Sequence, residues 1–171
     1  MFFGNDRLEF IRERSMSDDV STKPLVVVTG VGPGTGSAVV RRFATGGYRI
    51  AMLARDKTRL DALAAEIASA VPMACDVSDS AALERVLGEI DQRFGAPKVV
   101  VHNAVGGAFG KFQEIAREVL RANFETNAVA LLHLARQVAP RMIEIKPEAD
   151  APRRRCPSPW PDSCCPPSPL E

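Results

Sequence analysis

Four glycines lie within the eight residues TGVGPGTG (29–36), between an apolar run and a stretch of helical character. Gly30 permits a tight turn directly after the apolar run. Gly34 and Gly36 lack side chains, so that a pyrophosphate can approach the backbone and the following helix can pack closely on the strand. A helix N-terminus adds N–H groups and a partial positive charge. The segment therefore predicts an anion site for a nucleotide; the alternative is a turn with a structural role alone.

The glycine segment lies in a region, residues 24–146, where two hydrophobic periodicities alternate. Short apolar runs predict strands, and longer stretches with apolar residues at helical spacing predict helices. The expected strands are 25–29, 48–54, 71–77 and 97–104, and the expected helices are 37–46, 56–70, 78–94 and about 117–145. This alternation predicts an α/β fold of the Rossmann type, a doubly wound parallel sheet in the order 3-2-1-4, truncated after about four strands.

Four segments, in this order, make the sequence similar to the classical short-chain dehydrogenases/reductases over residues 24–146. They are TGVGPGTG (29–36), which fits the cofactor motif TGxxxGxG of the family, CDVSD (75–79), HNAV (102–105) and NFETNAVALLHLARQVAPRM (123–142). The resemblance implies a bound nicotinamide dinucleotide. The cofactor-binding residues that it implies are Thr29, Gly30, Gly34, Thr35, Gly36, Arg55, Asp76, Val77, Asn103 and Ala104. Asp76 would contact the adenine; the alternative is a helix cap or a loop acid.

The end of the second expected strand indicates which nicotinamide cofactor is bound. In the family this position faces the adenosine ribose, and an acid there would bind the ribose hydroxyls and repel a 2′-phosphate. Residue 54 is Ala, and Arg55 follows it directly. A guanidinium suits a phosphate by charge and by geometry, so the resemblance implies NADP(H) in preference to NAD(H). The alternative is that Arg55 is a solvated surface residue, and Asp56 is interpreted as a helix cap.

Two positions depart from the family pattern near the nicotinamide side of the site. His102 replaces an amide and Val105 replaces a glycine. We interpret His102 as a hydrogen-bonded strand residue rather than as a catalytic base. Val105 adds bulk where the ribose next to the nicotinamide would lie.

The long expected helix carries Asn127, which in the family bends the helix and holds a water of the proton relay. We expect this amide to be buried and hydrogen-bonded, and the alternative is a partly exposed helix residue. The core face of the helix is predicted to contain Leu120, Phe124, Leu131, Leu134 and Val138.

The other catalytic groups of the family have no counterpart in this sequence. The family uses a Tyr as general acid/base, a Lys four residues later and a Ser that positions the carbonyl. The single tyrosine is Tyr48, and Met52 lies four residues after it. The resemblance therefore implies an NAD(P)-binding oxidoreductase domain, with hydride transfer between NADP(H) and a carbonyl or alcohol substrate as the family reaction, that is catalytically incomplete as written. The alternatives are a non-catalytic nucleotide-binding or dimerising module and a frameshifted or truncated fragment.

The remaining composition sets expectations for the ends of the chain and for its partners. Residues 1–23 predict a flexible extension without a secretory signal, and residues 147–171 hold eight of the thirteen prolines, which predicts a disordered tail. The net charge of +1 favours neither nucleic acid nor a membrane surface as a partner. We expect a cytoplasmic protein with Cys75 buried, and a homo-oligomer formed through the Arg117–Ile145 helix.

Overall fold

Four parallel strands form one sheet within the described residues of this computed structural model, which are 23–108 and 110–144. The strands are β1 (Leu25–Thr29), β2 (Arg49–Ala54), β3 (Ala70–Ala74) and β4 (Val99–His102). Their order, β3-β2-β1-β4, confirms the order expected from the sequence. Because β1 lies at the centre and pairs with both β2 and β4, its carboxyl end is surrounded by the loops that follow its neighbours.

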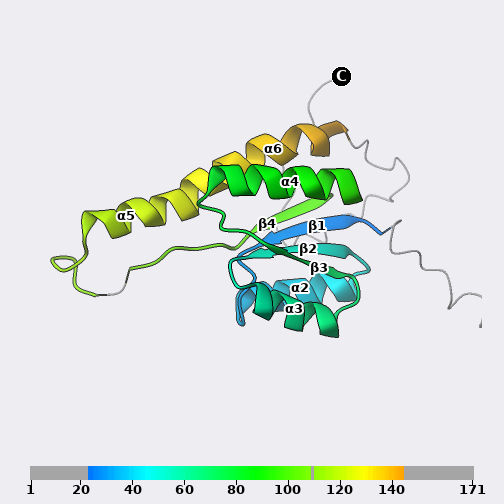
Figure 1. The fold of residues 1–171 in the computed structure, drawn as a ribbon, viewed down its shortest axis with the longest axis horizontal. Helices are drawn as coiled ribbons and strands as arrows, with labels where there is room; N and C mark the ends of the chain where they lie inside the picture. The colour runs from blue at the N-terminus through cyan, green and yellow to red at the C-terminus, as the bar shows by residue number, and fades with distance from the viewer. Residues whose placement is uncertain (1–22, 109, 145–171) are drawn as a thin grey trace, which may run out of the picture.

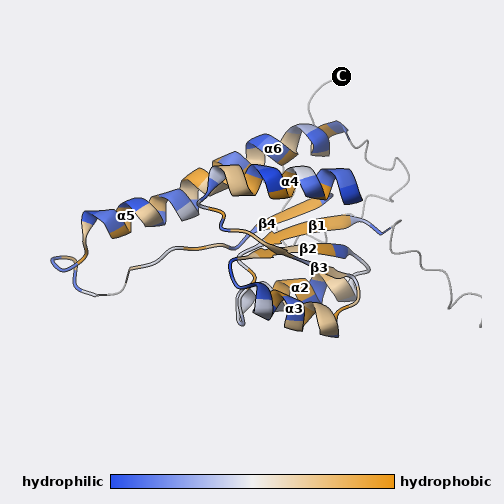
Figure 2. Ribbon diagram, viewed as in Figure 1, coloured by the Kyte–Doolittle hydropathy of each residue, from blue (hydrophilic) through white to orange (hydrophobic). Residues whose placement is uncertain are grey.

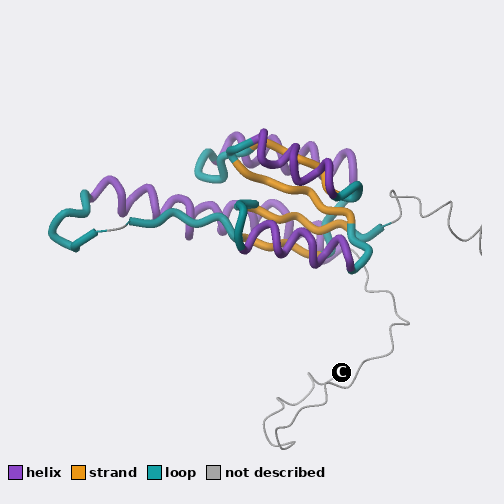
Figure 3. The backbone as a smooth tube through the Cα atoms, turned by 90° about the horizontal axis from the view of Figure 1, so that it is seen from below, coloured by secondary structure: helices purple, strands orange, loops and turns teal. Residues whose placement is uncertain are grey.

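Helices cover both faces of the sheet, as Figure 1 shows. The helices α2 (Thr35–Thr45) and α3 (Lys57–Glu66) lie on one face, and α4 (Ser80–Phe94) and α6 (Ala130–Glu144) lie on the other. The view in Figure 3, turned by 90°, shows the sheet between the same two layers. This arrangement is the Rossmann-type α/β fold that the alternating periodicities predict.

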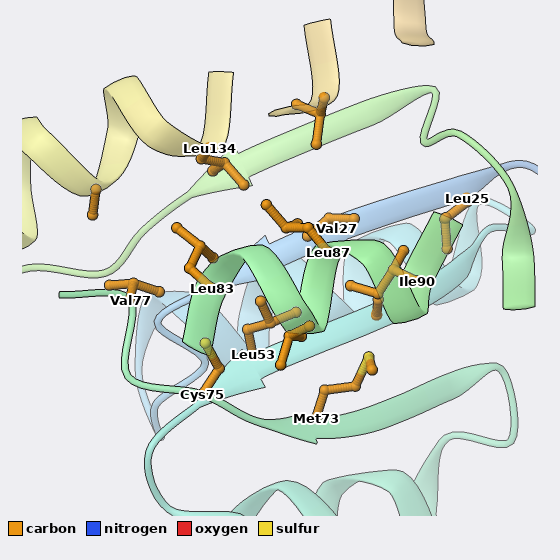
Figure 4. Close-up of a cluster of buried hydrophobic side chains, with 14 residues drawn as sticks. Leu25, Val27, Leu53, Met73, Cys75, Val77, Leu83, Leu87, Ile90 and Leu134 are labelled. Carbon is orange, nitrogen blue, oxygen red and sulfur yellow. The ribbon is translucent and has the colours of Figure 1, made fainter. Parts of the chain in front are cut away.

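Alternate residues of each strand enter two separate hydrophobic clusters. Val27 and Leu53 pack toward α4 and α6, in the cluster drawn in Figure 4, whereas Val26, Val28 and Met52 pack toward α2 and α3. The strands are therefore apolar on both faces, and Figure 2 shows β1 and β4 as hydrophobic along their lengths.

The long helix differs from the expectation in its interior. It consists of α5 (Arg117–Phe124), a single π-helical turn η2 (Glu125–Val129) and α6. In Figure 1, α5 projects beyond the sheet. Its apolar side chains Val119, Leu120 and Phe124 are exposed.

The core face expected for this helix is wrong in its first half. Leu120 is 68% exposed, Phe124 62% and Leu131 47%, whereas Leu134 and Val138 are buried as expected. Helical spacing shows which side chains share a face, but the extent of the sheet beneath them decides which are covered.

Other boundaries shift by a few residues, and α3 ends at Glu66 rather than at residue 70. The predicted extension (1–23, apart from Lys23) and the predicted tail (147–171) lie outside the described residues. Among the described helices, none is both long and apolar enough to cross a membrane.

Candidate functional site

A cavity of about 340 Å³ opens at the edge of the sheet where the parallel strands end. Six of the residues expected to bind the cofactor line it: Gly30, Arg55, Asp76, Val77, Asn103 and Ala104. They lie in the loops that follow all four strands, so the fold gathers positions that are far apart in the sequence. The other four are Thr29 at the end of β1 and Gly34, Thr35 and Gly36 at the start of α2. Open α/β sheets bind their ligands at this edge.

The glycines of the loop have different structural roles. Gly30 has φ of 69°, and a Cβ at this position would lie 2.4 Å from the Cα of Ala104. A Cβ at Gly36 would lie 2.6 Å from the carbonyl oxygen of Gly30, so the start of α2 packs directly on the turn. At Gly32 and Gly34, by contrast, a Cβ would meet no described atom within 4 Å. Packing of the protein therefore requires glycine at positions 30 and 36. Gly32 and Gly34 instead leave bare backbone beside open space.

The N-terminus of α2 keeps its partial positive charge. Gly34 is the N-cap, and among the described residues no side chain caps this end and no acid lies in the first turn. Both α3 and α4 are different, since Asp56 and Asp79 cap them with carboxylates. Of these three helices, only α2, which follows the glycine loop, begins without an acidic cap. The positive end of its dipole is therefore available to an anion.

Asp76 is a charged loop residue at the cavity. Its Oδ1 accepts hydrogen bonds from the Oγ of Ser78 at 2.7 Å and from the backbone N–H of Ser78 at 3.0 Å. These bonds, and then the positive charge of Arg55, lower the pKa of the Asp76 carboxyl below its ordinary value, although partial desolvation opposes the shift. The carboxylate thus lies in the cavity as an acceptor, and Asp79, not Asp76, caps α4.

Arg55 lies at the cavity together with a second arginine that the sequence did not single out. Asp56 caps α3 as expected, because its Oδ1 accepts the backbone N–H of Arg59 at 3.0 Å. The guanidinium of Arg59 lies 3.3 Å from the other carboxylate oxygen of Asp56, and all three side chains line the cavity. The sequence feature that indicates this second arginine is the presence of Arg55 and Arg59 on either side of the N-cap residue Asp56.

His102 connects three elements behind the cavity. Its Nδ1 lies 2.9 Å from the Oγ1 of the buried Thr29, and its Nε2 lies 3.2 Å from the carbonyl oxygen of Thr126 in η2. Because a carbonyl can only accept, Nε2 carries a proton, and in the neutral imidazole Nδ1 then accepts from the threonine hydroxyl. The interpretation of His102 as a hydrogen-bonded strand residue is confirmed.

Asn127 is exposed, so the expectation that its amide is buried is wrong. Both ends of its amide are nevertheless hydrogen-bonded: Oδ1 accepts the N–H of Gly106 at 2.7 Å, and Nδ2 donates to the carbonyl oxygen of Gly106 at 3.0 Å. The exposure follows from the position of η2 at the end of the sheet, where α5 begins to project. Asn127 therefore fixes the loop that carries Val105 and Gly106 into the lining of the cavity.

Comparison with known proteins identifies the family. The sequence model of the short chain dehydrogenases matches residues 24–149, which is most of the described region. The chain belongs to the short-chain dehydrogenase family. It is 31% identical over 118 residues to L-xylulose reductase of Homo sapiens, covering 69% of this chain and 47% of that protein. It is 32% identical over 117 residues to D-erythrulose reductase of Gallus gallus, covering 68% of this chain and 46% of that protein.

Two solved structures of reductases or dehydrogenases have a similar arrangement of strands and helices. One is L-sorbose reductase from Gluconobacter frateurii complexed with NADPH and L-sorbose, with a TM-score of 0.66 and 28% identity over 70% of this chain and 48% of that one. Another is an alcohol dehydrogenase from Thermococcus sibiricus complexed with 5-hydroxy-NADP, with a TM-score of 0.67 and 28% identity over 71% of this chain and 54% of that one. The chain spans about half the length of the curated relatives it matches.

Members of the short-chain dehydrogenase family bind NAD(P), and the site described here fits such a dinucleotide. The backbone at Gly32 and Gly34 is bare where a Cβ would have open space, and the adjacent helix start keeps its positive charge. Arginines and an ionised Asp76 lie along the remainder of the cavity. The residues present thus have the chemistry to hold a dinucleotide of this kind.

Proposed function

We propose that this chain binds NADP(H), in preference to NAD(H), in the cavity at the carboxyl edge of its sheet. The observation that carries the proposal is the single cavity that brings the turn at Gly30 together with Arg55 and Asp76. These groups have the chemistry of a dinucleotide site, in which backbone and a helix N-terminus face phosphates and side chains select the adenosine half.

Each group has a place in the proposed complex. The pyrophosphate lies against the loop from Thr29 to Gly36 and the N-terminus of α2. The adenine lies beside Asp76 and Val77, and the 2′-phosphate lies beside Arg55. Asn103 and Ala104 carry the nicotinamide half along the end of β4. Asn103 also donates from Nδ2 to the carbonyl oxygen of Gly30 at 2.9 Å, which fixes this wall to the glycine turn.

The reaction that we propose for the whole protein is hydride transfer between NADP(H) and a carbonyl or alcohol substrate. Several similar proteins are named as reductases or dehydrogenases of small hydroxylated compounds. Asn127 would take the relay position of the family. Tyr48 does not take the acid/base position, since it precedes β2 and packs against Phe43 with ring centroids 5.1 Å apart.

A second candidate function is a nucleotide-binding module that pairs with another subunit without catalysing hydride transfer itself. The exposed apolar side chains of the α5–α6 region favour it, since Leu120, Phe124, Leu131 and Leu132 are each at least 47% exposed. We propose a homo-oligomer through this region and a cytoplasmic location. Sedimentation of the full chain tests the association, and a monomer at all concentrations would contradict it. A third reading, a frameshifted or truncated fragment, predicts that the chain binds neither a cofactor nor a partner.

Calorimetric titration of the full chain with NADPH and NADH tests the proposed binding, with Gly34 as the position to vary. Asp and Ser are both favoured at an N-cap, and a side chain at Gly34 meets open space, so Gly34→Asp and Gly34→Ser should both fold. We expect Gly34→Asp to lose far more affinity than Gly34→Ser, because only Asp places a negative charge beside the pyrophosphate. Equal affinities in the two variants would contradict the placement of the phosphates.

A further inference from the structure

The mouth of the cavity contains a charged group that the proposed function has not used. Arg59 lies in the first turn of α3, and its side chain lines the cavity beside Arg55. It is about half exposed, at 54%, and its guanidinium is paired with Asp56 at 3.3 Å. An exposed pair at this distance is weak, because water screens both charges. The guanidinium of Arg59 can therefore exchange Asp56 for a stronger anion at small cost.

Asp56 contacts both the backbone and the side chain of Arg59. Its Oδ1 accepts the N–H of Arg59, and its Oδ2 faces the guanidinium of Arg59. The first contact caps α3 and is independent of the orientation of the arginine side chain. The second contact competes directly with any anion that enters the cavity mouth.

The charges around the mouth are balanced in the described structure. Arg55 and Arg59 contribute two positive charges to the lining, and Asp56 and Asp76 contribute two negative charges. Such a mouth offers a 2′-phosphate little net attraction while Asp56 remains paired with Arg59. Release of Arg59 from Asp56 would turn one guanidinium toward the incoming phosphate.

We propose that Arg59 is a second ligand for the 2′-phosphate of NADP(H), and that Asp56 restrains it by competing for the same guanidinium. This inference rests on the proposed function and adds to it the residue pair that sets the degree of cofactor selectivity. Arg55 alone gives a moderate preference for the phosphorylated ribose. Arg59 increases this preference when its guanidinium leaves Asp56 and contacts the 2′-phosphate.

Adenosine 2′,5′-bisphosphate and adenosine 5′-monophosphate are suitable probes, because they differ in the 2′-phosphate and report binding without hydride transfer. Calorimetry on the full chain should show Arg59→Gln weakening the bisphosphate by about 5- to 30-fold, the range for a charge-assisted contact at a half-exposed site. The monophosphate should change by less than about twofold. Equal effects on the two nucleotides, or no effect on either, would overturn the role of Arg59.

Lys57→Gln is the matched control. Lys57 lies in the same first turn of α3, but its Nζ contacts both carboxylate oxygens of Asp61, and Lys57 is outside the described cavity lining. If nearby positive charge alone attracted the bisphosphate, both variants would lose affinity equally. We expect Lys57→Gln to bind both nucleotides like the unmodified chain, and a loss equal to that of Arg59→Gln would overturn the proposal.

A double-mutant cycle tests the restraint by Asp56. Asp56→Asn keeps a good N-cap and removes the competing charge. It should tighten the bisphosphate about 3- to 10-fold in the unmodified chain and by much less in the Arg59→Gln background. Equal gains in both backgrounds would show that Asp56 acts by its charge alone, and would overturn the restraint. If neither nucleotide binds the unmodified chain, the proposed function itself fails. If both bind and Arg59→Gln changes neither affinity, the proposed function stands and only the role of Arg59 fails.

Discussion

The Nδ1 atom of His102 lies 2.9 Å from the hydroxyl of Thr29, where the ends of β4 and β1 meet. The same imidazole reaches the carbonyl oxygen of Thr126, so one side chain connects the strand before the glycine loop to the π-helical turn that precedes Asn127. The glycine loop and the loop held by Asn127 are thus connected through the hydrogen bonds of His102. A substitution at His102 should therefore alter the structure on both sides of the cavity.

Replacement of His102 by Ala should lower the free energy of unfolding by about 1–3 kcal/mol, because the hydroxyl of Thr29 loses its acceptor in a buried site. The measurement is urea unfolding of the full chain. Thr29→Val in the His102→Ala background should cost little more, since the unpaired hydroxyl is then removed. Additive costs of the two substitutions would contradict a direct bond between them.

Gly34→Ala and Gly36→Ala should differ sharply in stability. A Cβ at Gly36 would lie 2.6 Å from the backbone oxygen of Gly30 and 2.8 Å from the Cα of Val31, neither of which can move freely. We expect a loss of about 1–3 kcal/mol for Gly36→Ala, as for overpacking in a core. Gly34→Ala should cost less, below about 1 kcal/mol, since its Cβ has open space and only the preference of an N-cap for glycine over alanine is lost. Thermal unfolding of both variants measures the difference, and equal melting temperatures would contradict it.

The fold could be predicted from the sequence because each buried strand is a short β-branched or apolar run, such as Leu25–Thr29, and each helix repeats its apolar residues with a 3.6-residue period. The site could be predicted where residues closely follow a strand, as at Gly30, Arg55 and Asp76, because the carboxyl ends of parallel strands meet at one edge of the sheet. The exposure of Leu120 and Phe124 could not, because it depends on where the sheet ends beneath α5, as Figures 1 and 2 show. Arg59 was missed because its relation to the cavity appears only when α3 is packed on the sheet.

Arg55→Ala should weaken NADPH by about 10- to 150-fold, which corresponds to the roughly 1.5–3 kcal/mol of a hydrogen bond to a charged group. NADH should be affected far less, because it lacks the 2′-phosphate. Arg41→Ala is a suitable control, since Arg41 pairs with Glu66 at 2.7 Å and is outside the described cavity lining. Parallel losses for NADPH and NADH in Arg55→Ala would show that Arg55 is a structural residue only.

The free energy of unfolding should depend on pH through the carboxyl group of Asp76. Its pKa in the folded chain is lowered, chiefly by the two hydrogen bonds from Ser78, so the stabilisation is fully present above the ordinary pKa of 3.8 and is lost as the pH falls through the lower folded pKa. Ser78→Ala removes the hydroxyl contribution to this shift. Urea unfolding should show the variant less stable than the unmodified chain near neutral pH, with the difference shrinking as the pH falls below 3.8. A difference that stays constant through this range would contradict the coupling.

The 171-residue chain should bind NADPH without oxidising it in the presence of aldehydes, ketones or quinones. Positioned general acid/base catalysis contributes about 10²–10⁴-fold to rate, and none of the described residues that line the cavity is a tyrosine. Tyr48 precedes β2 at the opposite edge of the sheet from the cavity. Both ring nitrogens of His102 are hydrogen-bonded, Nε2 with the carbonyl oxygen of Thr126 and Nδ1 with the hydroxyl of Thr29, so neither nitrogen is free to act on a substrate. The measurement is the loss of reduced-nicotinamide absorbance, with binding checked separately by calorimetry and with His102→Ala alongside. Turnover by the unmodified chain that disappears in a His102→Ala variant still able to bind NADPH would contradict this prediction.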